Sequence, residues 1–149
     1  MEKKIVIACD HAGNEVKDAI IKHLKENGYE VTDFGCDGSA SVNYPDYAHL
    51  VCRAIQEGSA PLGILVCGTG IGMSMAANKH RGIRAALCEN EFSAEMTRRH
   101  NDANVICMGA RVLSVEKAIA LTDIFLSTPY EGGRHDARVA MLNALDDLK

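Results

Sequence analysis

The sequence of 149 residues has no apolar run approaching the ~20 residues that a membrane-spanning helix needs. Its first apolar stretch is too short for the core of a secretory signal peptide, because Asp10 ends it. Positive charge is not in excess either, since 16 Lys and Arg residues stand against 20 Asp and Glu residues. This balance offers no attraction to nucleic acid or to an anionic membrane. We therefore expect a protein that binds neither.

The six cysteines lack the spacings of a disulfide framework or a metal site. No C-x-x-C pair and no zinc-ligand rhythm occurs, and Cys9, Cys67 and Cys107 each end an apolar run. This distribution is typical of reduced thiols. We expect a cytoplasmic protein without a bound metal.

Short β-rich runs alternate with helical patterns along the whole chain. The sequence predicts strands over residues 4–9, 29–34, 62–67, 83–88 and 104–108. It predicts helices over residues 15–27, 47–57, 72–80, 92–99, 115–126 and 135–148. Each crossover has to return the chain to the same edge, so the alternation favours a parallel sheet. We expect residues 1–149 to form a single α/β domain, a doubly wound (Rossmann-like) three-layer sandwich with a five-stranded parallel sheet and helices on both faces.

The residues that follow the predicted strands are mostly polar or titratable. In such sheets ligands bind outside the carboxyl ends of the strands. The residues that the topology brings to that edge are Asp10, His11, Tyr44, Cys67, Gly109 and Arg111. The sequence therefore predicts a binding site there.

The segment LVCGTGIGM, residues 65–73, is the most informative part of this edge. Glycine at every second position lets the backbone turn tightly and leaves its N–H groups uncovered. A helical pattern follows, so these amides should lie where negative charge is favoured. A thiol, Cys67, beside such donors is typical of a site that stabilises an oxyanion. The alternatives are a buried structural Cys67 and a helix-capping Thr69.

The glycine loop matches neither common nucleotide motif. The third glycine of a dinucleotide fingerprint is missing, and no Gly-Lys-Ser/Thr of a P-loop follows. A second phosphate-binding pattern lies near the end of the chain, where Arg134 and Arg138 stand four residues apart after Gly132 and Gly133. Two guanidinium groups at a helix N-terminus can bind one phosphate. The alternative is a solvated basic face that includes Asp136.

His100 and Asn101 end a predicted helix just before the fifth strand, so they lie at the opposite edge from Cys67. A helix of about ten residues is ~15 Å long, which separates the two edges within one chain. Either His100 is structural, or a second copy of the chain completes the site. We expect a homodimer with shared active sites, and a dimer of dimers remains an alternative.

Four ordered motifs resemble the ribose-5-phosphate isomerase B family: CDH at 9–11, CGTGIG at 67–72, RHND at 99–102 and YEGGRHDAR at 130–138. The match runs from the N-terminus to the last helix. The family also includes allose-6-phosphate isomerases and the subunits of galactose-6-phosphate isomerase. The resemblance implies that an aldose phosphate and a ketose phosphate, ribose 5-phosphate and ribulose 5-phosphate, are interconverted through an enediolate, without a metal or organic cofactor.

The resemblance also implies roles for individual residues. Cys67 is the base that moves a proton between the first two sugar carbons, Thr69 assists it, and His100 opens the sugar ring with Asp10 as a helper. Some relatives have a glutamate where Met73 stands, and methionine cannot take a proton, so Cys67 remains the base here. The residues implied in substrate binding are Asp10, His11, Tyr44, Gly68, Thr69, Gly70, Ile71, Gly72, Asn101, Arg111, Arg134 and Arg138.

Three other functions stay open at this point. A hexose-6-phosphate isomerase differs only in the length of its pocket. A cysteine phosphatase would use Cys67 as a nucleophile, but its loop closes with an arginine where Met73 and Ser74 stand. A non-catalytic module that binds phosphorylated sugars would not need the thiol or His100.

Overall fold

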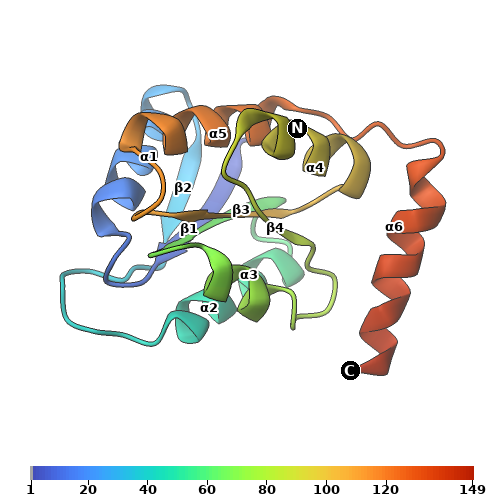
Figure 1. Cartoon of the computed structure of the whole chain (residues 1–149), viewed down its shortest axis with the longest axis horizontal. Coiled ribbons are helices and arrows are strands. Elements are labelled where there is room, and N and C mark those ends of the chain that lie inside the picture. Colours follow the sequence, from blue (N-terminus) through green and yellow to red (C-terminus); the bar gives the residue numbers. More distant parts are fainter. Residues whose placement is uncertain (1) are drawn as a thin grey trace.

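A computed structural model describes residues 2–149 of the chain (Figure 1). Five strands form one parallel sheet in the order β2-β1-β3-β5-β4. The strands are β1 (Lys4–Cys9), β2 (Glu30–Asp33), β3 (Leu62–Cys67), β4 (Ala85–Leu87) and β5 (Val105–Gly109). The predicted five-stranded parallel sheet is confirmed.

Helices cover both faces of the sheet, as predicted. One face carries α1 (Asn14–Glu26), α4 (Glu91–Asn101) and α5 (Val115–Ser127), and the other carries α2 (Tyr44–Gln56) and α3 (Ile71–Ala77) (Figure 1). Side chains alternate along each strand, so Ile64 and Val66 of β3 belong to the first core while Leu65 and Cys67 belong to the second. Cys67 therefore faces the layer of α2 and α3.

The last helix, α6 (His135–Ala144), stands beside α4, outside the two layers (Figure 1). The helix predicted over residues 135–148 ends early, because Leu145–Leu148 forms a 3₁₀ helix, η1. Such a tighter turn is frequent at the C-terminus of an α-helix.

Two other predicted helices differ from the observed ones by three residues at one end. The helix predicted over residues 47–57 begins at Tyr44, because Asn43 is extended and Pro45 occupies the first turn, where its missing N–H costs nothing. The helix predicted over residues 72–80 spans Ile71–Ala77. It ends there because the Asn78 side chain accepts from the Ala85 N–H at 2.8 Å and donates to the Ala85 carbonyl at 2.9 Å. These bonds turn the chain toward β4.

The helices are short and amphipathic. The 13-residue α1, for example, buries Val16, Ile20 and Leu24 along one face, which is the spacing of a helix packed on a sheet. Nowhere in residues 2–149 does a helix reach the length and apolar character needed to cross a bilayer.

The strand order changes direction between β1 and β3. From β1 the chain passes to β2 on one side, and from β3 it passes to the edge strand β4 on the other side before it returns to β5 between them. Cys9 is aligned with Val66, so Asp10 and Cys67 leave the sheet side by side at this switch point. Open α/β sheets bind their ligands in the crevice at such a point.

At Gly63, β3 passes directly beneath α2. A Cβ atom there would lie 2.7 Å from Cγ1 of Val51 and 3.0 Å from Cδ1 of Ile55. We expect Gly63→Ala to lower the free energy of unfolding by about 1–3 kcal/mol in a denaturant titration, because overpacking forces the layers apart. Combining it with Val51→Ala removes the clashing methyl group, so the double variant should lose less than the sum of the two single losses. Strictly additive losses would contradict this packing argument.

Candidate active site

The loop after β3 gathers a thiol, a hydroxyl and backbone donors. Cys67 is only 5% exposed, and its Sγ accepts a hydrogen bond from the Gly70 N–H at 3.1 Å. The Ile71 N–H donates to Oγ1 of Thr69 at 3.3 Å. Thr69 thus accepts from the first residue of α3, although the N-cap residue of this helix is Gly70, and its O–H can still donate. Two of the amides that the sequence predicts as oxyanion donors therefore point at Sγ of Cys67 and Oγ1 of Thr69.

The glycines of the loop allow close approaches that any side chain would block. Gly70 has a φ of +81°. A Cβ atom at Gly72 would lie 2.6 Å from Cζ of Tyr44, so the tyrosine ring packs directly on the loop. A Cβ atom at Gly109 would lie 2.6 Å from the carbonyl carbon of Thr69. These contacts bring Tyr44 from α2 and the end of β5 against the Cys67 loop.

Asp10 and His11 follow β1 at the same edge. Asp10 is 8% exposed, and its Oδ1 accepts from the Ala12 N–H at 2.9 Å. Nδ1 of His11 accepts from the Val42 N–H at 3.2 Å, so in the neutral ring Nε2 carries the proton. His11 is thereby held as a donor. The role of the Val42 amide was missed, because no sequence pattern reports a backbone contact across a loop.

Arg111 completes this first group. The backbone N–H of Arg111 donates to the Gly68 carbonyl at 2.9 Å. Nη1 of its side chain lies 3.3 Å from the position that a Cβ atom at Gly68 would occupy. The guanidinium thus lies over the glycine loop. The first group comprises Asp10, His11, Tyr44, Cys67, Gly68, Thr69, Gly70, Ile71, Gly72 and Arg111.

The other candidates lie at the opposite edge of the sheet. His100 and Asn101 form the end of α4, which is 11 residues or about 16 Å long and returns the chain to the amino end of β5. Arg134 and Arg138 lie at the start of α6, beside the end of α4, and both are exposed. Asp136, which the alternative interpretation assigned to a solvated basic face with them, accepts from the Tyr130 hydroxyl at 2.7 Å. Within one chain the predicted site residues therefore form two separate groups, one at each edge of the sheet.

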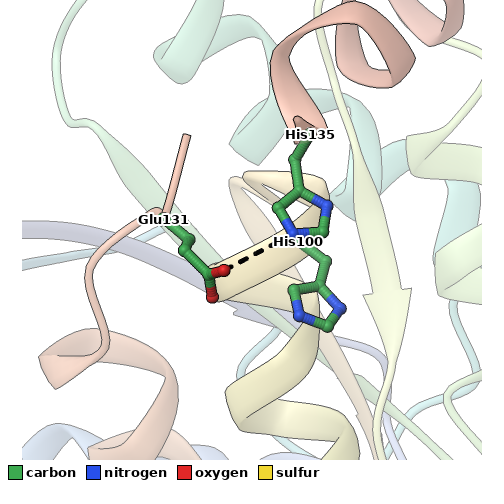
Figure 2. Close-up of side chains that lie close together, drawn as sticks. All are labelled: His100, Glu131 and His135. Carbon is green, nitrogen blue, oxygen red and sulfur yellow. Dashed lines mark ion pairs between the residues drawn. The ribbon is translucent and has the colours of Figure 1, made fainter. Parts of the chain in front are cut away.

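Figure 2 shows a histidine pair at the centre of this second group. The rings of His100 and His135 stack with centroids 4.3 Å apart and planes inclined by 15°. Nε2 of His135 lies 3.7 Å from Oε1 of Glu131, and it accepts from Nε of Arg134 at 3.4 Å. His135 and Glu131 were not among the predicted site residues. The available signal was the position of His135 directly after Arg134 in the last motif.

These three side chains also have the composition of a metal site. His100, Glu131 and His135 offer donor atoms within 4.8 Å of one another. However, the lone pairs of two nearly parallel rings lie in separate planes and cannot converge on an ion about 2.0–2.1 Å from each nitrogen. The arrangement fits a ring stack and does not fit a metal centre.

Comparison with known proteins identifies the family. Residues 5–142 match the family model described as Ribose/Galactose Isomerase. The chain belongs to this family. The matched range contains both groups of candidates, and the resemblance inferred from the four motifs is confirmed.

Individual relatives support the same family assignment. The chain is 46% identical over 147 residues to ribose-5-phosphate isomerase B of Escherichia coli (strain K12), covering 99% of each sequence. The structure of ribose-5-phosphate isomerase B from Clostridium thermocellum superposes with a TM-score of 0.96 at 45% identity, covering 97% of this chain and 98% of that one. The enzyme from Mycoplasma genitalium with bound ribulose-5-phosphate has a TM-score of 0.93 at 40% identity, covering 98% and 97%.

Burial keeps four of the other thiols protonated. It raises the pKa of Cys9 and Cys52 to about 12, that of Cys88 to about 11, and that of Cys107 well above its ordinary value. A thiol with a pKa of about 12 is a thiolate in only about one molecule in ten thousand at pH 8. These four cysteines are therefore poor nucleophiles in the folded protein.

We expect iodoacetamide at pH 8 to alkylate Cys67 before Cys9, Cys52, Cys88 and Cys107. The reason is that burial disfavours the thiolate at the other four, which are at most 1% exposed, whereas Cys67 is 5% exposed at the carboxyl edge of the sheet. Peptide mapping over time measures the order of labelling, and Cys67→Ser provides the unlabelled control. Labelling of Cys52 or Cys107 in the folded protein at the rate of Cys67 would contradict the expectation.

Proposed function

We propose that this chain is an aldose–ketose isomerase that interconverts ribose 5-phosphate and ribulose 5-phosphate through an enediolate, with residues 1–149 acting as one sugar-phosphate isomerase domain. The observation that carries the proposal is the hydrogen bond between Sγ of Cys67 and the Gly70 N–H, inside a loop of a chain that belongs to the ribose/galactose isomerase family. The relative with bound ribulose-5-phosphate supports the substrate class. The scheme uses only groups of the chain and requires no cofactor.

Cys67 acts as the base in this scheme. Its thiolate removes the proton from C2 of the open-chain aldose, and the electron pair forms the C1–C2 double bond while O1 becomes an oxyanion. The amides of the Gly68–Gly72 loop other than those of Gly70 and Ile71, which donate to Sγ of Cys67 and Oγ1 of Thr69, stabilise this oxyanion. Losing one such donor typically costs about 10²–10³ in rate. The O–H of Thr69 helps to move a proton from O2 to O1. The thiol then returns its proton to C1, which leaves a ketone at C2.

His100 opens the furanose ring before this step, with Asp10 as a helper. Asn101 and Tyr44 bind sugar hydroxyls. The phosphate is bound by four donors: the Nε2–H of His11 and the guanidinium groups of Arg111, Arg134 and Arg138. The stack of His135 on His100 supports the ring-opening role of His100, because it holds the His100 imidazole in one orientation.

A homodimer with shared active sites resolves the separation of the two groups. The α4–α6 region of one copy supplies His100, Asn101, Arg134 and Arg138 to the Cys67 loop of the other. Apolar side chains on the free surfaces of α3, α6 and η1 support such a contact, since a second copy would bury them. These are Ile71, Met75, Met141, Leu142, Leu145 and Leu148.

The pentose is favoured over a hexose because the similar proteins above are ribose-5-phosphate isomerases B. The family model also names galactose, so turnover of ribose 5-phosphate and allose 6-phosphate in one assay tests this choice. Six free thiols support a reducing, cytoplasmic location.

Cys67→Ala and His100→Asn should fail at different steps. Enzyme-catalysed exchange of deuterium from D₂O into C1 of ribulose 5-phosphate needs the base but no ring opening, because this ketose is open-chain. We expect Cys67→Ala to abolish both this exchange and the conversion of ribose 5-phosphate while substrate binding persists. His100→Asn should lower conversion by about 10²–10⁴ and spare the exchange. Nuclear magnetic resonance measures both rates. Turnover by Cys67→Ala would exclude the thiol as base, and equal losses in His100→Asn would exclude a ring-opening role.

Shared sites also predict complementation between inactive variants. When Cys67→Ala and His100→Asn chains are co-expressed, each mixed dimer has one site with both substitutions and one site with neither. Random pairing makes half of the dimers mixed, so about a quarter of the wild-type activity should return. Two substitutions within one group, Cys67→Ala with Thr69→Ala, should give no activity beyond that of the two variants assayed separately, because every site then carries one of them. If each site lay within one chain, no combination would recover activity.

A further inference from the structure

One arginine that lies outside both groups of candidates contacts the end of α4 and the end of α6. Nε of Arg84 donates to the carbonyls of Asn101 and Asp102, each at 3.1 Å, and Nη2 donates to the Asp102 carbonyl at 2.8 Å. Its Nη1 donates to Oδ1 of Asn143, near the end of α6, at 2.8 Å. The side chain is 18% exposed. The sequence predicted no role for it.

The end of α4 needs these bonds. Its last carbonyls have no partner within the helix. The backbone of Asp102 also adopts the left-handed conformation, with a φ of 47°. Within residues 2–149 it is the one non-glycine residue with a positive φ. Nη1 of Arg98 binds Oδ1 of Asp102 at 3.0 Å and the Ala103 carbonyl at 2.7 Å. Arg84 and Arg98 together hold the turn that sets the direction of His100 and Asn101.

The position of α6 depends on contacts at its two ends. At its start, His135 stacks on His100, and the Glu131 N–H donates to the Arg99 carbonyl at 3.0 Å. Toward its other end, a cleft of about 430 Å³ lies between α6 and β4, lined by Arg84, Asn101 and Leu142 among others. Arg84 spans this cleft to reach Asn143. Just beyond α6, Oδ2 of Asp146 in η1 also accepts from the Gly82 N–H at 2.7 Å. The Arg84–Asn143 bond is therefore one of several contacts that hold this end of α6, and it is made by the same side chain that bonds to the end of α4.

We propose that Arg84 is a positioning residue that sets the geometry of the second group of active-site residues. It fixes the ring-opening His100 and the sugar-binding Asn101 relative to Arg134 and Arg138, which bind the phosphate. The inference rests on the proposed function. Lysine cannot replace Arg84, because only the planar fork of a guanidinium donates to both helix ends at once.

Loss of this contact should separate two measurable rates. Arg84→Lys and Arg84→Met leave the Cys67 loop intact, so deuterium exchange into saturating ribulose 5-phosphate should stay within a few-fold of wild type. Conversion of ribose 5-phosphate should fall by about 10–10²-fold, because a displacement near 1 Å costs up to about that much. KM should rise for both sugars. Asn143→Ala cuts only the contact to α6 and should raise KM in the same direction.

Arg81→Met is the matched control. Arg81 also binds the C-terminal segment, through the Asp146 carbonyl at 2.8 Å and Oδ1 of Asp147 at 2.6 Å, but its bonds do not reach α4. We expect its conversion rate and KM to equal those of wild type. In hydrogen–deuterium exchange of backbone amides, α6 should exchange faster in Arg84→Lys than in Arg81→Met.

Wild-type kinetics in Arg84→Lys and in Asn143→Ala would overturn the positioning role, even if Arg84→Met does not fold. Equal loss of conversion and exchange in Arg84→Lys would also overturn it, because the damage would then reach the first group. A wild-type protein that neither converts ribose 5-phosphate nor exchanges deuterium would instead refute the proposed function.

Discussion

The direction of the parallel sheet is the constraint on which the rest of this structure depends. All five strands point the same way, so every residue that leaves a strand emerges at one edge and every residue that ends a crossover helix emerges at the other. Cys67 ends β3 at one edge, and His100 lies near the end of α4, a helix of 11 residues or about 16 Å that returns the chain to the other edge. A base and a ring-opening acid placed this way within one chain need a second copy to meet. Dimerisation is then part of the chemistry that we propose.

The carboxyl edge is built from close approaches of backbone and side chains. Tyr44 reaches the loop because Gly72 has no side chain, and Thr69 passes β5 because Gly109 has none. The Gly70 N–H is aimed at Sγ by the left-handed turn that Gly70 itself allows. These close backbone contacts fix the conformation of the loop around Cys67.

The amino edge is organised differently, by stacked rings and by arginines. His135 covers one face of His100, and Arg84 links the end of α4 to α6 across an open cleft. Long polar contacts take the place of a packed core here, because α6 lies outside the two layers of the sandwich. The geometry of this edge therefore depends on the ring stack and a few hydrogen bonds.

The sequence by itself determined the sheet, the helices on its faces and the division of the candidates between two edges. These features follow from the periodicity of apolar residues, the spacing of glycines and the rule that the carboxyl ends of parallel strands lie at the same edge of a sheet. The first two can be read from short stretches of the chain. Only the tertiary structure decided that His135 stacks on His100 and that Arg84 bonds to Asn143, 59 residues away. Contacts of this range depend on how whole elements pack, and no local pattern of residues encodes that packing.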